Sequence, residues 1–322
     1  MPRVLLVFLD GVGLGDDDAS YNPFVTASLP VLHALLDARP IVRASAPFHA
    51  ARASLVALDA TLGVAGTPQS GTGQATLLTG VNAAQRCGRH FGPWVPAQLR
   101  PLVRNENVLV RAQAAEKRVA FANAYPEEVL RPERATALPA GERRPIPHSR
   151  TRSGTSFLRA GPPLAALGAG ILNRHTRELE RGDAVASEIT NDGWREHLGR
   201  TAVPRIDAAD AGRNLARIAR AHDLTLFAHY ATDYAGHTRD AAAARLALER
   251  CDRFFAGLVE HMPDDMLLVV ASDHGNIEDG RVGHTRNPAI GLMVGAGHAA
   301  FAGRVSALTD VTPAIVEVLE QR

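Results

Sequence analysis

Five short runs of consecutive apolar residues constrain the fold of this chain more than any other feature. Their hydrophobicity is continuous and does not alternate, which is typical of strands that are covered on both faces. Strands of this kind belong to a parallel sheet that lies between two layers of helices. The predicted strands span residues 4–9, 119–124, 224–230, 266–271 and 290–294.

Alanine-rich stretches with helical periodicity lie between several of these runs. Residues 208–222 place Leu215, Ile218 and Ala219 on one face of a helix, and residues 241–261 carry apolar side chains at a similar spacing. The alternation predicts an α/β protein with a mostly parallel sheet and helices on both faces.

One long segment does not follow this alternation. Residues 131–205 carry prolines at positions 132, 139, 145, 147, 162 and 163 and several arginines instead of strand-helix repeats. We therefore expect a core made of residues 1–130 and 206–322. Residues 131–205 are expected to form a small cap over the active site or a surface excursion.

Composition excludes several classes of protein. The 322 residues are 46% hydrophobic and 21% charged, and the formal charge of +1 gives no indication of a nucleic-acid partner. The two cysteines are far apart and form no CxxC pair, so a disulfide framework and a thiolate zinc site are not expected. No apolar run reaches the roughly 18 residues of a membrane span, and the first run ends at Asp10 without a cleavage site. We expect a cytoplasmic protein without a membrane partner; its oligomeric state is not predicted.

Carboxylate and imidazole side chains follow the predicted strands in several places. Ligands of open α/β sheets bind beyond the carboxyl ends of the strands, so these positions are candidates for a common site. Each of these residues alone would more often be a helix cap or a turn residue, but together they indicate a metal site. The candidates are Asp10, Asp233, His237, Asp273, His274 and His284.

The chemistry of these side chains narrows the choice of metal ion. Aspartate oxygen combined with histidine nitrogen suits Mn²⁺, Zn²⁺ or Fe²⁺ better than Ca²⁺ or Mg²⁺. Asp233 and His237 are four residues apart and would share one face of a helix. Six ligands exceed the need of one open site, so we expect two divalent ions, Mn²⁺ or Zn²⁺ first and Mg²⁺ as an alternative.

A glycine-rich segment supplies a candidate nucleophile. Within residues 66–80, Ser70 stands where a tight turn would enter a helix, whose free N–H groups favour a phosphate oxygen. A simple serine N-cap is the competing interpretation, and Thr72 is the competing hydroxyl.

With these residues assembled, the chain resembles the alkaline phosphatase superfamily of metalloenzymes. Within it, the chain is similar to the branch of cofactor-independent phosphoglycerate mutases and phosphopentomutases. The resemblance rests on Asp10-Gly-Val-Gly, Ser70-Gly-Thr-Gly-Gln, Asp233-x-x-Gly-His237, Ser272-Asp273-His274-Gly275 and Gly283-His284-Thr285. It implies an alkaline-phosphatase-like sheet, with one ion bound by Asp233, His237 and His284 and a second by Asp10, Asp273 and His274. Ser70 would be the nucleophile and would bridge or adjoin the two ions.

The chain departs from the mutases in one respect. Those enzymes carry a large inserted domain after the nucleophile helix, whereas here residues 82–116 lead directly to the predicted strand at 119–124. The substrate-gripping residues of that insertion therefore have no counterpart. Four arginines of the excursion are candidates for clamping a phosphate or carboxylate: Arg143, Arg144, Arg150 and Arg152.

These features predict a two-metal enzyme that transfers or hydrolyses phosphoryl groups of a small phosphorylated metabolite through a phosphoserine. A phosphoglycerate mutase or phosphopentomutase activity is the main alternative. A phosphodiesterase or a noncatalytic metal-binding protein is a lesser one. A sulfatase is disfavoured, because Ser70 lacks the Cys-x-Pro-x-Arg type of context that formylglycine formation requires.

Overall fold

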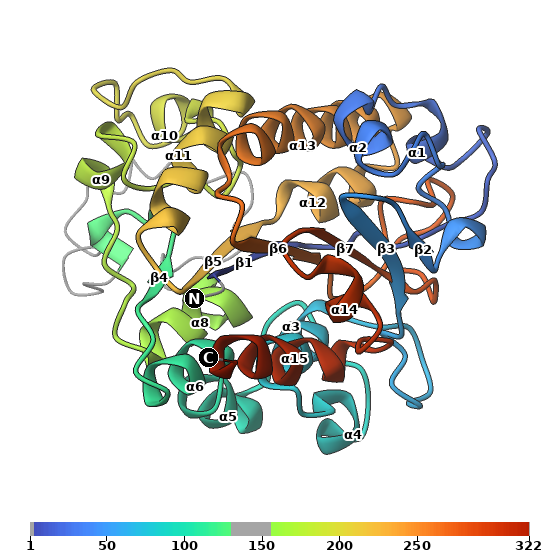
Figure 1. Cartoon of the computed structure of the whole chain (residues 1–322), viewed down its shortest axis with the longest axis horizontal. Helices are drawn as coiled ribbons and strands as arrows, with labels where there is room; N and C mark the ends of the chain where they lie inside the picture. Colours follow the sequence, from blue (N-terminus) through green and yellow to red (C-terminus); the bar gives the residue numbers. More distant parts are fainter. Residues whose placement is uncertain (1–2, 130–155, 322) are drawn as a thin grey trace, which may run out of the picture.

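A mixed sheet runs through the centre of the computed structural model, which describes residues 3–129 and 156–321 (Figure 1). Within these ranges the sheet has seven strands in the order β2-β3-β7-β6-β1-β5-β4. The strands are β1 (Arg3–Leu9), β2 (Phe48–His49), β3 (Ala53–Leu58), β4 (Val119–Phe121), β5 (Leu224–His229), β6 (Met266–Ala271) and β7 (Ala289–Gly295). β1 pairs in parallel with β5 and β6, β4 pairs in parallel with β5, and β7 is antiparallel to both β6 and β3.

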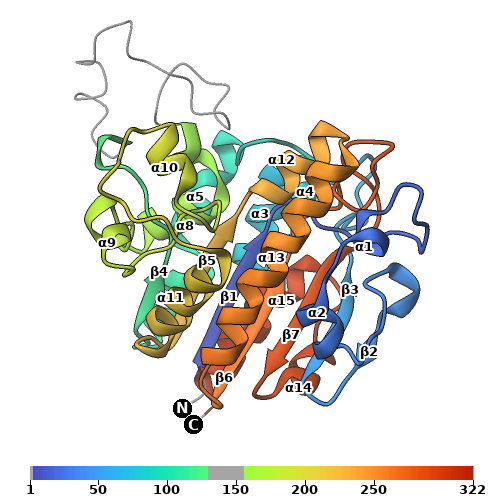
Figure 2. The same ribbon diagram turned by 90° about the horizontal axis from the view of Figure 1, so that it is seen from above.

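The central strand β1 shows why this sheet needs helices on both sides. Alternate residues point into two different cores, with Leu6 in one and Leu5 in the other, and both are fully buried. Leu9 is in register with His229 of β5, and Phe8 is in register with Ala271 of β6. The carboxyl ends of three neighbouring strands therefore lie at one edge of the sheet (Figure 2).

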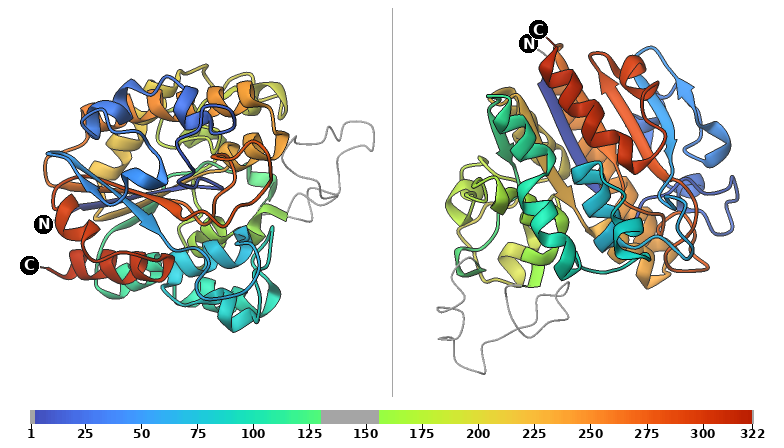
Figure 3. Two further views of the ribbon diagram at one scale, coloured as in Figure 1. Left: turned by 90° about the vertical axis from the view of Figure 1, so that its right-hand side faces the viewer. Right: turned by 90° about the horizontal axis from the view of Figure 1, so that it is seen from below.

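Two layers of helices enclose the sheet. One face is covered by α1, α2, α11 and α13, and the other by α3 to α6, α8, α14 and α15, as the view from below shows (Figure 3). Their bounds are α1 (Pro23–Thr26), α2 (Pro30–Leu35), α3 (Ser70–Thr79), α4 (Ala83–Cys87), α5 (Arg100–Asn105), α6 (Val108–Ala114), α8 (Gly161–Gly168), α9 (Thr176–Glu180), α10 (Asp192–Glu196), α11 (Ala208–Arg220), α12 (Ala231–Thr238), α13 (Ala241–His261), α14 (His298–Ala302) and α15 (Leu308–Glu320). None of the described helices has the length and apolar character needed to cross a bilayer.

The predicted α/β class is confirmed, with differences in detail. All five predicted strands are present, although β4 and β5 end earlier than expected, and the helix predicted at 208–222 ends at Arg220. β2 and β3 were missed. β7 is antiparallel because residues 272–288 return along the same edge of the sheet, whereas a parallel strand would require a crossover connection.

The described part of the expected excursion, residues 156–205, has two kinds of surroundings. α8 packs against α3, α5 and α6, and Leu164 and Ala165 belong to the same core as Leu6 of β1. α9 and α10 lie beside a small separate cluster that includes Leu179 and Trp194. α3, which begins at Ser70, is followed by α4, a 3-10 turn at Ala97–Leu99, α5 and α6 before β4, in agreement with the expected short connection.

Candidate active site

The turn after β1 lies against α12 at the carboxyl edge of the sheet. Asp10 follows the last residue of β1 and is 7% exposed. Gly11 adopts a positive φ of 66°, and a Cβ atom there would lie 2.4 Å from Oδ1 of Asp233. Only glycine fits both the left-handed backbone and this close approach. The turn thus sets the carboxylates of Asp10 and Asp233 beside each other.

The turn after β6 supplies a second carboxylate and an imidazole. Both Asp273 and His274 are fully buried. The backbone N–H of Gly11 donates to Oδ1 of Asp273 at 3.2 Å. Ser272 accepts a hydrogen bond from the N–H of Val12 at 2.8 Å and donates to the carbonyl of His274 at 3.1 Å. These bonds fix the turn, so that neighbouring side chains both face the same site.

Asp10, Asp273 and His274 form a compact cluster that we call the inner group. Nε2 of His274 lies 3.4 Å from Oδ1 of Asp10 and 3.7 Å from Oδ2 of Asp273. One potential ligand atom from each residue lies within 4.8 Å of those of the other two. The three side chains therefore have the arrangement needed to hold a single cation.

Asp233, His237 and His284 form a second cluster, the outer group. α12 contains the first two, and their four-residue spacing places Oδ2 of Asp233 3.2 Å from Nε2 of His237. Nε2 of His284, from the loop before β7, lies 3.5 Å from Oδ1 of Asp233 and 3.1 Å from Nε2 of His237. The side chain of His237 is about half exposed, so the outer group is the one that faces solvent.

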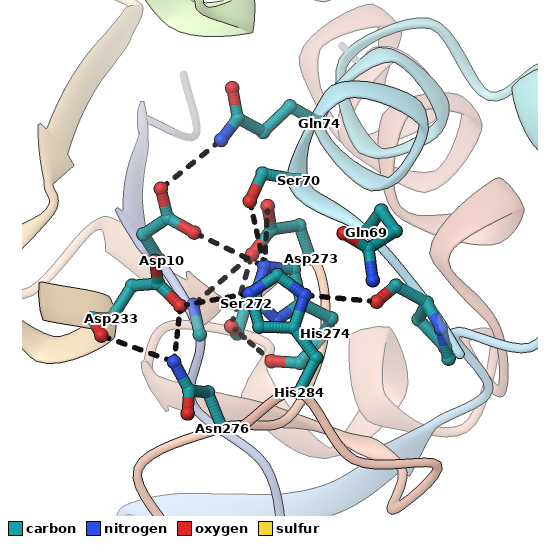
Figure 4. A network of polar contacts seen from close by, with 12 residues as sticks. Asp10, Gln69, Ser70, Gln74, Asp233, Ser272, Asp273, His274, Asn276 and His284 are labelled. Carbon is teal, nitrogen blue, oxygen red and sulfur yellow. Dashed lines mark hydrogen bonds and ion pairs between the residues drawn. The ribbon is translucent and has the colours of Figure 1, made fainter. Parts of the chain in front are cut away.

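Ser70 and the stacked rings of His274 and His284 connect the two groups (Figure 4). The ring centroids of His274 and His284 are 3.9 Å apart. Oγ of Ser70 lies 2.9 Å from Nε2 of His274. Ser70 is the first residue of α3 and Gln69 is its N-cap, so the serine is not the cap itself. The structure thus brings together all seven residues that the sequence indicated as candidates.

The competing hydroxyl of Thr72 is engaged elsewhere. Its Oγ accepts a hydrogen bond from the N–H of Phe91 at 3.1 Å and donates to the carbonyl of Gln69 at 3.3 Å. The side chain is fully buried beneath the loop that covers the start of α3. Geometry therefore favours Ser70 over Thr72 as the reactive hydroxyl.

Burial and mutual repulsion dominate the electrostatics of the inner group. Burial raises the pKa of Asp10 well above its ordinary value, and the charges of Asp273 and Asp233 raise it further. Burial also raises the pKa of Asp273. Burial opposes charge on His274, but the two carboxylates of the inner group outweigh it and raise the pKa of His274 to about 10. Without a cation, this imidazole holds a proton that partly neutralises its neighbours.

The outer group has the opposite balance. Burial alone would raise the pKa of Asp233, but hydrogen bonds with His237 and His284 lower it well below its ordinary value. The same contact with Asp233 raises the pKa of His237. Asp233 is therefore an anion at neutral pH and ready to bind a cation.

The inner group also has unsatisfied ligand atoms, which provide a test of whether a cation fits. Oδ1 of Asp10 and Oδ2 of Asp273 are buried and have no hydrogen-bond partner. Buried carboxylate oxygens without partners are costly unless a proton, a hydrogen-bond donor or a metal ion satisfies them. Two carboxylates and one imidazole form a borderline-hard donor set that suits Mn²⁺ or Zn²⁺. The residues fit a divalent ion in the inner group, and the outer group offers the same chemistry with one carboxylate and two imidazoles.

Three buried residues that support the site were not predicted. Gln74 donates from Nε2 to Oδ2 of Asp10 at 3.2 Å, and Asn276 donates from Nδ2 to Oδ1 of Asp233 at 2.6 Å. Glu278 accepts hydrogen bonds from the N–H groups of Gly13 and Asn276 at 2.9 and 2.8 Å. The sequence held one indication of each residue, namely its closeness to a predicted site residue. Gln74 lies four residues after Ser70, and the other two lie within four residues of His274. The four predicted arginines of the excursion, Arg143, Arg144, Arg150 and Arg152, lie outside the described residues.

Part of the chain is similar in sequence to known proteins. Residues 197–321 match a family model described as the Metalloenzyme superfamily, and this segment contains five of the seven candidate residues. A 2,3-bisphosphoglycerate-independent phosphoglycerate mutase from Cereibacter sphaeroides is 32% identical over 162 residues, which cover 45% of this chain and 31% of that protein. A phosphopentomutase from Deinococcus radiodurans is 36% identical over 88 residues, which cover 26% of this chain and 22% of that protein. The similarity thus spans less than a third of either relative.

Similarity in fold to a solved structure extends over nearly the whole chain. The PH0037 protein from Pyrococcus horikoshii superposes with a TM-score of 0.55 at 13% sequence identity, covering 99% of this chain and 96% of that one. At this identity the likeness concerns the fold alone.

Proposed function

We propose that this chain is a member of the alkaline phosphatase superfamily of metalloenzymes and that it transfers or hydrolyses the phosphoryl group of a small phosphorylated metabolite. The inner and outer groups would each hold one divalent ion, and Ser70 would be the nucleophile. One observation carries the proposal: Oγ of Ser70 lies 2.9 Å from the inner group, whose imidazole stacks on the outer group. A serine hydroxyl between two cation sites has no evident structural use.

The position of Ser70 suits an in-line attack on phosphorus. As the first residue of α3 it lies at a helix N-terminus, where the partial positive charge favours phosphoryl oxygens. Two divalent ions would make the serine alkoxide accessible near neutral pH and would neutralise charge on those oxygens. The bond from Oγ to phosphorus forms as the bond to the ester oxygen breaks, which gives a phosphoserine. Water or a second hydroxyl then takes the phosphoryl group and restores the serine.

The outer group accounts for substrate access in this scheme. The side chains of Asp10, Ser70 and the two other members of the inner group are almost entirely buried, whereas that of His237 is 51% exposed. A substrate would therefore enter past the outer group, with its phosphoryl group foremost. The remainder of a small metabolite would stay near the solvent side.

Substitution of Ser70 tests the covalent route. Ser70→Ala should keep both ions but lose turnover of p-nitrophenyl phosphate by a factor of at least about 100, because no other described hydroxyl has this geometry. Metal content by elemental analysis and phosphate release are the two measurements. Ser306→Ala, which removes an exposed hydroxyl that binds Asp310, is the matched control and should keep full activity. Full turnover in Ser70→Ala would exclude this residue as the nucleophile.

The activities for which the relatives are named favour a second candidate. A mutase moves the phosphoryl group between two hydroxyls of one substrate, and the two relatives described above are named as mutases. Release of inorganic phosphate from 3-phosphoglycerate or ribose phosphates, measured against formation of the isomer, distinguishes the two activities. Isomer formation without phosphate release would replace the hydrolase proposal with the mutase.

A further inference from the structure

A buried glutamine of α3 contacts the inner group (Figure 4). Gln74 is 2% exposed and lies one helical turn after Ser70, so both side chains are on the same face of α3. Its Nε2 donates to Oδ2 of Asp10 at 3.2 Å, and its Oε1 accepts from the backbone N–H of Gly161 at 2.8 Å. One helix therefore carries the proposed nucleophile and a direct partner of a proposed metal ligand.

Gly161 fixes the orientation of this amide. A backbone N–H can only donate, so the amide oxygen must face Gly161 and the NH₂ group must face Asp10. The approach is close: a Cβ on Gly161 would lie 2.7 Å from Cβ of Gln74 and 3.0 Å from Cδ1 of Leu78. Glycine at the start of α8 is therefore needed for Gln74 to keep this position.

The hydrogen bond from Gln74 makes the two carboxylate oxygens of Asp10 different. Oδ2 is occupied by the amide, whereas Oδ1 faces Nε2 of His274 at 3.4 Å and is buried without a hydrogen bond. We propose that Gln74 is a positioning residue, which holds Asp10 so that only Oδ1 is presented to the cation of the inner group. This inference rests on the proposed function, because it requires that the inner group binds a metal ion.

The outer group has a comparable arrangement, drawn from a different part of the chain. Nδ2 of Asn276 donates to Oδ1 of Asp233 at 2.6 Å and to its carbonyl at 3.1 Å. In each group, one carboxylate is oriented by a neutral amide, which adds no charge to a site that already contains several. Residues that hydrogen-bond to a metal ligand without contacting the metal orient that ligand, and their loss typically costs about 10- to 100-fold in metal affinity.

The test is a titration with Mn²⁺ alone, with the free ion measured by electron paramagnetic resonance. Gln74→Met keeps the length and apolar stem of the side chain but removes its donor and acceptor. In a His284→Ala background, which leaves only the inner group complete, it should weaken Mn²⁺ binding by about 10- to 100-fold. Gln113→Met is the matched control, because Gln113 donates to the carbonyl of Ala169 in an exposed position and should leave the affinity unchanged.

A second variant covers the case in which Gln74→Met does not fold. Gly161→Ala keeps the glutamine but displaces it, so it should also weaken the inner ion in the same background. Affinity equal to that of the His284→Ala parent, in a folded variant of either kind, would overturn the positioning role. Wild-type protein that binds only one Mn²⁺ ion would instead overturn the proposed two-ion function, and wild-type protein that binds none would overturn this inference as well.

Discussion

Removal of divalent metal ions should destabilise this protein by an amount that the inner group sets. Without a cation, Oδ1 of Asp10 and Oδ2 of Asp273 are buried and have no hydrogen bond, since Nε2 of His274 approaches them only to 3.4 and 3.7 Å. Each buried polar atom left unsatisfied costs about 1–3 kcal/mol, so the pair costs about 2–6 kcal/mol. At roughly 2 °C per kcal/mol for a chain of this size, the melting temperature should fall by about 4–12 °C.

The assay is calorimetry at one fixed scan rate on protein treated with a chelator, with and without added Mn²⁺ or Zn²⁺. Asp273→Asn should lose the gain on metal addition, because the amide is a poor ligand for either ion. Its metal-free form should melt no lower than metal-free wild type, because the substitution removes the charge of Asp273 that repels Asp10. Asp264→Asn, at an exposed position, is the matched control and should keep the full gain.

Two results would refute the expected fall in melting temperature or its cause. A wild-type melting temperature that responds neither to the chelator nor to added metal would show that the two orphaned oxygens are satisfied in another way. The inner group would then not be a metal site. A full gain on metal addition in Asp273→Asn would refute the assignment of this residue as a ligand.

Two further predictions concern pH and packing. The pKa of His274 is raised to about 10 in the metal-free protein, so a cation must displace its proton. The Mn²⁺ affinity of the inner group should therefore rise by up to about tenfold per pH unit between about pH 6 and 9. An affinity that does not change with pH in calorimetric titrations would contradict this. Gly257→Ala should destabilise the protein by at least about 1–3 kcal/mol in urea unfolding, because its Cβ would lie 2.0 Å from the carbonyl oxygen of Ala209 in α11. Gly303→Ala, whose Cβ would meet nothing closer than 3.6 Å, should be nearly neutral, and equal effects of the two variants would refute the packing explanation.

Much of the fold could be predicted from the sequence, because burial imposes a pattern of apolar residues along a short stretch of chain. β6 and α13 have the predicted bounds, since a strand covered on both faces and a long amphipathic helix each impose a pattern on consecutive residues. β3 was missed although it is an apolar run, because nothing beside it in the sequence marks it as a strand. The direction of β7 also could not be predicted from its own sequence, since it depends on the path of residues 272–288.

The features of the site can also be separated into those that the local sequence predicted and those that required the structure. The spacing of Asp233 and His237 implied a shared helix face, and α12 provides it. The choice between Ser70 and Thr72 required coordinates, because both follow the same glycine-rich turn. The role of Gln74 required them too, since its partners are 64 and 87 residues away.

The sequence by itself determined which side chains are available: hard and borderline ligands at the ends of apolar runs, and a serine where a helix begins. Those properties are local, because they follow from residue type and from periodicity along a few turns of chain. The family resemblance implied two groups of candidate ligands, but only the tertiary structure decided that the groups adjoin, which oxygen of Asp10 has no hydrogen bond, and how α8 holds Gln74 against it. These are consequences of strand order and helix packing, which join residues that no local pattern connects.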